Sequence, residues 1–317
     1  MRYLLSYKFG ACRGERCGWA GISVTRYFLL FVLLISNSTS HAVSVRDDKQ
    51  NNIEIEKPAQ RIITLAPYLT ELLFAIDAGD KIVATVQFSD YPPAAKAIKR
   101  LGNYENINIE QVIALKPDIV LAWDSANNPN QLKQLEKLGI RLYRSEPRDL
   151  IDIATTLERF GELTGKEVKA KAIADNFTNE LGALQKQYAG RQTITGFYQV
   201  WHTPIYTING EHIISKVMQL CGIRNVFADL PVLAPTVPIE SVLMKDPQMI
   251  IVSGMAQAEP QWLAKWRDWP SMTAVKAKNL FFIPPDLIQR HSLRMLEAAR
   301  LMCEQADEAR GHLKILQ

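Results

Sequence analysis

The sequence predicts an α/β protein of two Rossmann-like lobes that a single long α-helix joins, with a ligand cleft between the lobes. Two stretches of similar size alternate short β-rich apolar runs with helical patterns, which is typical of α/β lobes. One long amphipathic run separates the stretches, and a segment of the first stretch recurs in the second. A duplicated α/β unit on either side of one helix accounts for these three observations.

The elements follow one another in a regular order. The first stretch predicts strands at 61–65 and 81–86, a helix at 67–79 between them, a loop through the Pro92-Pro93 pair, two further helix and strand pairs, and a helix at 150–163. The second stretch predicts a strand at 193–200, a helix at 213–221, a helix and strand pair, a strand at 279–285 and a last helix from His291 to Arg310. Alternation of this kind favours parallel sheets.

The run from Lys166 to Tyr188 contains no proline and one glycine. Its apolar residues recur at steps of three and four, so it predicts one amphipathic helix of roughly six turns, about 35 Å long. These residues are Val168, Ala172, Ile173, Phe177, Leu181 and Leu184. We interpret 166–190 as a bridge between an N-terminal lobe at 60–165 and a C-terminal lobe at 191–317.

An internal repeat supports the two lobes. Residues 109–121, IEQVIALKPDIVL, match residues 239–251, IESVLMKDPQMII, without a gap. Each copy predicts a short helix that ends before a proline, followed by a buried parallel strand. Two copies predict similar lobes that face one another, and a cleft between lobes is a usual place for a ligand.

The N-terminal segment predicts export. Residues 27–36, YFLLFVLLIS, form an apolar run of about ten residues, whereas a membrane-spanning helix needs roughly twenty. We therefore expect residues 1–42 to be a signal peptide that is cleaved near Ala42, which places the mature protein in the periplasm. A retained membrane anchor is the alternative. The long leader also suggests that translation starts at Val24 rather than at Met1.

The charge of the mature part excludes some partners. The formal net charge of the chain is +4, but removal of residues 1–42 leaves 32 basic and 32 acidic residues. The mature part therefore has no net positive charge that would favour nucleic acid or an anionic membrane surface. We expect no nucleic-acid partner and a monomeric protein. The polar residues 43–59 predict an N-terminal arm, either a short hairpin or a loose segment.

Two cysteines lie beyond the leader, Cys221 and Cys303, each on the apolar face of a predicted helix. An even pair in an exported protein predicts a disulfide that ties the last helix to the second lobe. Two separate buried thiols are the alternative. Because no histidine or cysteine stands at ligand spacing beside either one, we expect no metal site. We also expect no cofactor.

Motifs for catalysis are absent: the sequence has no GxSxG, HExxH, P-loop or GxGxxG pattern, so we expect no enzyme. An enzyme that uses Asp286 or His291 as an acid or base is the distant alternative. Aromatic and polar residues instead follow the predicted strands, where an open α/β sheet presents its ligand crevice. These residues are Phe88, Trp123, Trp201, Asp286 and Arg290, with Tyr104 in the loop before the repeated helix.

Several motifs carry a family resemblance. The segments RIITLAPYLTELLFA, SDYPP, INIEQVIALKPDIVLAW, VMQLCG, IESVLMKDPQMIIVSG and DLIQRHSLRMLEAARLMC resemble the vitamin B12-binding proteins of bacterial ABC importers, the BtuF type. These belong to the helix-bridged, class III periplasmic binding proteins, which also carry ferric siderophores and haem. The resemblance covers residues 60–310. It implies capture of cobalamin or a related corrinoid and delivery to an inner-membrane ABC transporter; a ferric siderophore or haem as the ligand is the alternative.

The resemblance also implies roles for single residues. It implies that the corrin is contacted by Phe88, Tyr104 and Trp123 in the first lobe, and in the second by Trp201 or Val200, the loop near Ala234, Asp286 and Arg290. Flat aromatic faces and a few hydrogen-bonding groups suit a broad, amide-fringed corrin. The better-known cobalamin binder has tyrosine, tryptophan and tryptophan where this chain has Phe88, Tyr104 and Ala234. Pairing of Asp286 with Arg290 is the structural alternative to ligand contact.

Two glutamates, one per lobe, occupy the same position in the repeat. The resemblance implies that Glu110 and Glu240 dock onto arginines of the permease subunits, and a two-fold arrangement suits a two-fold transporter. The alternative is that both are first-turn carboxylates, each worth about 0.3–1 kcal/mol to its helix. A single stiff connecting helix further predicts a largely pre-formed site with modest closure on ligand binding.

Overall fold

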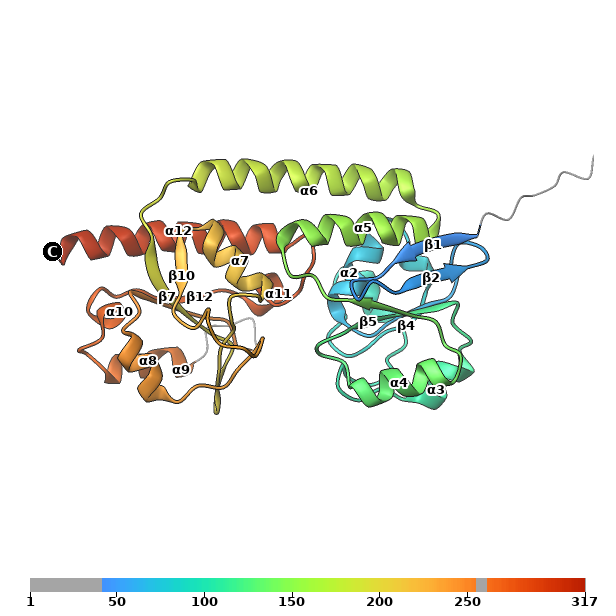
Figure 1. Cartoon of the computed structure of the whole chain (residues 1–317), viewed down its shortest axis with the longest axis horizontal. Helices are drawn as coiled ribbons and strands as arrows, with labels where there is room; N and C mark the ends of the chain where they lie inside the picture. Colours follow the sequence, from blue (N-terminus) through green and yellow to red (C-terminus); the bar gives the residue numbers. More distant parts are fainter. Residues whose placement is uncertain (1–41, 255–260, 317) are drawn as a thin grey trace, which may run out of the picture. The chain divides into compact units, whose positions relative to one another are not determined.

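The computed structural model describes residues 42–254 and 261–316 (Figure 1). The predicted signal peptide, apart from its last residue, lies outside the described residues. These described residues belong to one compact unit. No helix within the described ranges is both long enough and apolar enough to cross a membrane.

The first lobe is built on a four-stranded parallel sheet in the order β4-β3-β5-β6. Alternate residues of each strand face opposite sides, so Ile62 and Leu121 pack towards α2 and α5, whereas Ile63 and Val120 pack towards α3 and α4. Both faces are therefore covered, as parallel sheets require. The elements are β3 (Ile62–Thr64), α2 (Pro67–Ala75), β4 (Ile82–Ala84), α3 (Ile109–Ala114), β5 (Ile119–Trp123), α4 (Pro129–Lys137), β6 (Leu142–Ser145) and α5 (Leu150–Thr164).

The second lobe repeats this plan with a parallel sheet in the order β10-β7-β11-β12. Ile251 packs towards α7 and α12, and its neighbour Ile250 packs towards α8 and α9 on the other face. The two-lobed α/β architecture is thus confirmed. The elements are β7 (Ile194–Gln199), α7 (Ile213–Leu220), β10 (Ile223–Asn225), α8 (Ile239–Lys245), β11 (Met249–Val252), α9 (Gln261–Ala264), α10 (Thr273–Lys276), β12 (Leu280–Phe282), α11 (Pro285–Ile288) and α12 (Met295–Ile315).

The repeat predicted from the sequence is present as two helix and strand pairs, α3 with β5 and α8 with β11. In both copies the residue before the proline, Lys116 or Asp246, has a positive φ, at 46° and 38°. The steric conflict of proline with a preceding helical residue explains why each helix stops there. Figure 1 shows α3 and α8 on the sides of their sheets that face away from α6.

The connecting helix is α6 (Glu167–Tyr188), and Figure 1 shows it running along α5 and α12. The predicted apolar face was partly wrong: Val168 is 87% exposed, and Ala172 is exposed as well. The buried stripe instead passes through Ala170, where α5 comes so close that a side chain at Gly161 would lie 2.5 Å from the Ala170 Cβ. Small residues permit this close approach, so the larger Val168 faces solvent. The remaining buried residues of the stripe are Ala174, Phe177, Leu181, Leu184 and Tyr188.

One hydrophobic core continues from the first lobe into the second. It contains Tyr68 and Phe160 of the first lobe, Phe177 of α6, and Met218 and Met302 of the second lobe. The predicted disulfide between Cys221 and Cys303 is present and joins α7 to α12 within this core. Large relative motion of the lobes would expose part of this shared apolar surface to water.

The last helix begins later than predicted, at Met295 rather than at His291. The amide of Ser292 donates to the carbonyl of Arg290 at 2.7 Å, which is a tight turn rather than a helical hydrogen bond. The side chains of Arg290 and Ser292 are engaged by a carboxylate of the first lobe. Tertiary contacts of this segment therefore override the helical pattern of its sequence.

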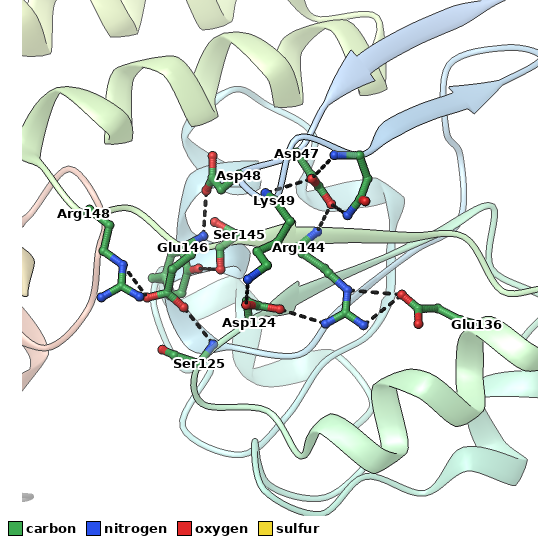
Figure 2. Close-up of polar contacts among 12 residues, drawn as sticks. Asp47, Asp48, Lys49, Asp124, Ser125, Glu136, Arg144, Ser145, Glu146 and Arg148 are labelled. Atoms are coloured by element: carbon green, nitrogen blue, oxygen red, sulfur yellow. Dashed lines mark hydrogen bonds and ion pairs between the residues drawn. The ribbon is translucent and has the colours of Figure 1, made fainter. Parts of the chain in front are cut away.

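The described part begins with an antiparallel hairpin of two strands, β1 (Val43–Arg46) and β2 (Asn52–Ile55). Carboxylates of its turn fasten it to the β6 region: Asp47 accepts from the amide of Arg144 at 3.3 Å, and Asp48 accepts from the amide of Glu146 at 2.6 Å (Figure 2). The hairpin alternative for the N-terminal arm is therefore correct.

Candidate ligand-binding site

The carboxyl ends of β3, β4 and β5 meet at one edge of the first sheet, and a buried amide ties their loops together. The side chain of Asn127 donates to the carbonyl of Leu65 at 2.9 Å and to that of Tyr104 at 2.7 Å. Its oxygen accepts from the amide of Trp123 at 2.7 Å. Two of the predicted ligand residues, Tyr104 and Trp123, are thus held in a fixed relation.

Phe88 lies in the loop after β4 and is 66% exposed, with a φ of +66°. A non-glycine residue in this region is under strain of about 1–2 kcal/mol. Hydrogen bonds on either side hold the loop: Gln87 donates to the carbonyl of Gly102 at 2.8 Å, and Thr85 donates through its hydroxyl to Ser89 at 2.8 Å. An exposed aromatic ring on strained backbone is characteristic of a functional position.

Trp123 ends β5 and lies where the two lobes touch. Its ring packs edge to face against Tyr68, 5.6 Å between centroids, and against His291 of the second lobe, 5.0 Å between centroids. The indole Nε1 is buried and has no hydrogen-bond partner among the described residues. The structure therefore places Trp123 at the lobe boundary with a donor unsatisfied.

A polar network anchors the residue after Trp123 (Figure 2). Asp124 forms ion pairs with Arg144 at 2.8 Å and with Lys49 of the hairpin turn at 3.3 Å, and Arg144 also pairs with Glu136 at 2.8 Å. This end of the sheet is therefore fixed from the side of the N-terminal hairpin, which a loose arm could not do.

In the same network, Glu146 accepts from the amide of Ser125 at 2.7 Å and lies 3.6 Å from Arg148. Burial raises the pKa of Glu146, and the hydrogen bond with Ser125 and the charge of Arg148 oppose that shift. The loop after β5 is thus held to the loop after β6.

Trp201 lies in a small hairpin of β8 (Trp201–His202) and β9 (Ile205–Tyr206) that follows β7. Its ring lies 4.7 Å from the ring of His202, which stacks on Trp262 at 5.6 Å. These contacts lie within the second lobe, so they do not join Trp201 to the first-lobe residues. Ala234 is exposed in a nearby segment that pairs with Tyr206 through Thr236.

Asp286 and Arg290 form the predicted ion pair, at 2.6 Å, and ligand contact by either residue stays a prediction. Arg290 also contacts two first-lobe carboxylates, Glu71 and Asp90, each at 2.9 Å. Burial would lower the pKa of Arg290, but the hydrogen bond and charge of Glu71 and the charge of Asp286 outweigh it, so the pKa is raised. The guanidinium is therefore a buried cation enclosed by three carboxylates.

Glu71 is the first-lobe residue at the centre of this cluster, and we name Glu71, Asp90, Asp286, Arg290 and Arg294 the seam cluster. Besides Arg290, Glu71 accepts from the hydroxyl of Ser292 at 2.6 Å and from Arg294 at 2.6 and 3.1 Å. Sequence reasoning missed both Glu71 and Asn127. The available signal for Glu71 was a single carboxylate within the apolar run PYLTELLFA.

Two histidines, His212 and His291, lie beside the seam cluster where the two lobes touch. The rings of His212 and His291 lie 5.9 Å apart, and Nδ1 of His212 accepts from the amide of Ile214 at 3.2 Å. Burial lowers the pKa of His212 to about 4 and that of His291 to about 3, and the charge of Arg148 acts in the same direction. Both imidazoles are neutral near pH 7. His291 is 2% exposed, which does not suit a base that exchanges protons with solvent.

Glu110 and Glu240 are exposed in the first turns of α3 and α8, and within the described residues neither forms an ion pair. An exposed apolar side chain lies about one turn away in each helix, Ile113 in α3 and Met244 in α8. The two lobes thus present the same combination of a carboxylate and an apolar group. No cluster of residues that could hold a metal ion occurs in residues 42–254 and 261–316.

Comparisons with known proteins identify the family of the chain. The model of a family described as "Periplasmic binding protein" matches residues 62–287. The chain is 39% identical over 247 residues to a "Vitamin B12-binding protein" of Vibrio cholerae serotype O1, which is 78% of this chain and 88% of that protein. It is 34% identical over 248 residues to a protein of the same name from Photorhabdus laumondii, again 78% of this chain and 88% of that one.

Solved structures show the same fold. The crystal structure of the periplasmic vitamin B12-binding protein BtuF of Vibrio cholerae superposes with a TM-score of 0.74 at 37% identity, covering 80% of this chain and 98% of that chain. The periplasmic haem-binding protein BhuT, in complex with two haems, superposes with a TM-score of 0.69 at 18% identity, covering 78% and 98%. The second likeness concerns the fold alone.

Proposed function

Because the chain belongs to the periplasmic binding protein family, we propose that it captures cobalamin or a related corrinoid between its lobes. The observation that supports this ligand most strongly is the 39% identity to a vitamin B12-binding protein across 88% of that protein. Members of a binding-protein family hold their substrate without transforming it, so this role requires no cofactor. We take residues 60–165 and 191–317 as the two lobes and 166–190 as the bridge.

The residues at the sheet edges suit a corrin. Phe88 offers an exposed aromatic face, Tyr104 and Trp123 are fixed beside each other by Asn127, and Trp201 stands at the corresponding edge of the second sheet. Aromatic faces bind a broad apolar plate well. The indole donor of Trp123, which lacks a protein partner among the described residues, would hydrogen-bond a ligand carbonyl.

The seam cluster favours an amide-bearing ligand over an anionic one. Its three carboxylates and two guanidinium groups leave one net negative charge. Asp90 and Asp286 keep 46% and 20% of their side-chain surface exposed, and a carboxylate oxygen accepts from an amide N–H. Haem propionates or an acidic siderophore would meet repulsion here, so Asp286 suits direct ligand contact better than Arg290 does.

Delivery to an inner-membrane ABC transporter is the second part of the proposal. Glu110 and Glu240 are exposed, and each has an apolar neighbour in its helix, so each lobe offers an arginine of the permease a partner of opposite charge. We propose that the protein works in the periplasm as a monomer after cleavage of the leader near Ala42. A periplasmic location is what membership of the family implies.

Titration calorimetry tests the ligand. The chain from Val43 onwards would be titrated with cyanocobalamin, and in parallel with cobinamide, haem and a ferric hydroxamate. We expect one-to-one binding of cyanocobalamin that is at least about tenfold tighter than binding of haem or the hydroxamate, a difference of about 1.4 kcal/mol. Heat from haem or the hydroxamate without heat from cyanocobalamin would overturn the corrinoid proposal and leave the fold and the transport role in place.

A further inference from the structure

We propose that Glu71 is a positioning residue for ligand binding: acting through Arg290, it holds carboxylates of both lobes in the arrangement that receives the ligand. This inference rests on the proposed function, because it concerns the same site. The only sequence signal for Glu71 is its place as a single carboxylate within an apolar run, and its contacts form only when residues about 220 positions apart meet.

The bonds of Glu71 link the lobes. Both of its carboxylate oxygens accept from the second lobe, from Arg290 at 2.9 Å, from Ser292 at 2.6 Å and from Arg294 at 2.6 Å. Glu71 is only 6% exposed, so its charge has lost most of its contact with water. A buried carboxylate is tolerated when its oxygens are fully engaged by cations and donors. The contact therefore favours one specific approach of the 290–294 segment to α2.

Arg290 connects Glu71 to the two carboxylates that we propose contact the ligand. Its Nη1 is shared between Glu71 and Asp90, and its Nη2 contacts Asp286. Asp90 lies two residues beyond Phe88, in the loop that presents the exposed aromatic ring. One guanidinium thus connects the buried glutamate to the Phe88 loop of the first lobe and to α11 of the second.

Glu71 also sets the charge that the ligand meets. With its carboxylate present, Asp90 and Asp286 do not have to neutralise Arg290 and Arg294 alone, and the seam cluster remains net negative. Replacing Glu71 by glutamine would make the cluster neutral and would turn one acceptor into a donor that faces guanidinium groups. Asp90 and Asp286, the groups that we assign to ligand amides, would then be the only carboxylates of the cluster left to balance its two guanidinium groups.

A double-mutant cycle tests whether Glu71 acts through Arg290. Cyanocobalamin affinity would be measured for Glu71→Gln in the wild-type background and in an Arg290→Gln background. We expect Glu71→Gln to weaken binding about tenfold in the first background, because it removes a charged acceptor of Arg290, and less than about twofold in the second. Equal losses in both backgrounds, or no loss in the first, would overturn the proposal.

A matched control comes from a similar ion pair outside the seam. Glu180 of α6 pairs with Arg300 of α12, and their side chains are 42% and 47% exposed. Glu180→Gln removes the same charge between two helices, and we expect it to leave cyanocobalamin affinity unchanged. A loss equal to that of Glu71→Gln would show a general charge effect and would overturn the specific role of Glu71.

A second measurement needs no ligand. Spin labels at Leu138→Cys in the first lobe and Met244→Cys in the second, both exposed positions, report the distance between the lobes. The distance distribution between the two labels is measured by double electron–electron resonance. We expect Glu71→Gln to broaden this distribution, and Ser292→Ala to broaden it less. Glu180→Gln should leave it as narrow as in the wild type. An unchanged distribution in Glu71→Gln would overturn positioning. If the wild type fails to bind cyanocobalamin, the proposed ligand fails, whereas this measurement still decides the role of Glu71.

Discussion

The indole of Trp123 and the imidazole of His291 meet edge to face across the lobe boundary, with ring centroids 5.0 Å apart and planes inclined at 72°. Tyr68 packs against both rings, and His212 packs against His291. This aromatic layer lies next to the seam cluster, because Arg290 and His291 are neighbours in the chain. Neutral imidazoles fit such a layer, whereas a buried imidazolium would lose its hydration.

Folding stability should therefore fall as the medium becomes mildly acidic. In the unfolded chain both histidines take up a proton near pH 6.5, but in the folded chain the pKa of His212 is about 4 and that of His291 about 3. Between pH 6.5 and about 4 the unfolded state binds more protons, so stability decreases by up to about 1.4 kcal/mol per pH unit for each histidine. Well above pH 6.5 the two histidines no longer change the unfolding free energy, because both are then neutral in the folded and the unfolded chain. Urea unfolding at several pH values between 8 and 5 measures this dependence.

One variant tests the origin of this pH dependence of the unfolding free energy. His291→Phe keeps an aromatic ring against Tyr68 and Trp123 and should remove about half of the dependence. A wild-type stability that is the same at pH 7 and pH 5 would contradict the prediction.

Phe88 should show stability and binding changing in opposite directions. Phe88→Gly removes the strain of a positive φ and loses little packing because the ring is exposed, so we expect a gain of about 1 kcal/mol in unfolding free energy. The same change removes an aromatic face from the proposed site and should weaken cyanocobalamin binding about tenfold or more. Thermal unfolding and calorimetry on one preparation measure both effects.

Lys278 is the matched control for Phe88, since it also has a positive φ, 58°, and lies in the turn after α10. Lys278→Gly should raise stability by a similar amount without affecting ligand affinity. If Phe88→Gly binds cyanocobalamin as tightly as the wild type, the ring has no part in ligand binding.

The fold was largely predictable because its signals are local. Alternating apolar runs, the proline-terminated repeat and the long helical run each lie within a short stretch of sequence. Prediction and structure differ where tertiary contacts determine the packing: the periodicity predicts Val168 on the buried face of α6, but the close approach of Gly161 to Ala170 buries another face of the helix. The start of the last helix was likewise displaced from His291 to Met295.

The site was predictable only in part, for a similar reason. Strand ends identify Phe88 and Trp123 as edge residues, since parallel strands bring their carboxyl ends together. The roles of Glu71 and Asn127 depend on partners far away in the chain, 219 residues for Glu71 and Arg290 and 62 for Asn127 and Leu65. No spacing rule in a single sequence reveals such pairs.

Asn127 should prove necessary for the arrangement of Tyr104 and Trp123. Asn127→Ala leaves two carbonyls and one amide without their partner, so we expect a loss of about 2–4 kcal/mol in stability and clearly weaker cyanocobalamin binding. Asn128→Ala is the control, because it removes only the N-cap of α4, worth about 1 kcal/mol, one residue away. Chemical unfolding and calorimetry would separate the effects. If Asn127→Ala and Asn128→Ala weaken cyanocobalamin binding equally, the weaker binding reflects lower folding stability rather than loss of the arrangement of Tyr104 and Trp123.

Docking to the transporter should depend on Glu110 and Glu240 without any effect on ligand capture. Each glutamate lies on a helix that faces away from α6, with an exposed apolar residue one turn on, Ile113 or Met244 (Figure 1). Charge reversal by Glu110→Arg or Glu240→Arg sets a cation against the proposed permease arginines, so each should weaken the complex at least about tenfold. The two together should abolish it, because the lobes contribute equivalent contacts.

The measurement is binding of the ligand-loaded protein to the detergent-solubilised cobalamin transporter of the same organism, with calorimetry of cyanocobalamin beside it. Met244→Ala keeps both carboxylates and should weaken the complex by a smaller factor, since it removes only apolar contact. Glu158→Arg, an exposed position on α5, is the matched charge reversal and should have no effect on the complex. If Glu158→Arg weakens transporter binding as much as Glu110→Arg, the effect reflects net charge. If neither Glu110→Arg nor Glu240→Arg weakens transporter binding, the two glutamates only stabilise the N-termini of their helices, and the permease contacts another surface.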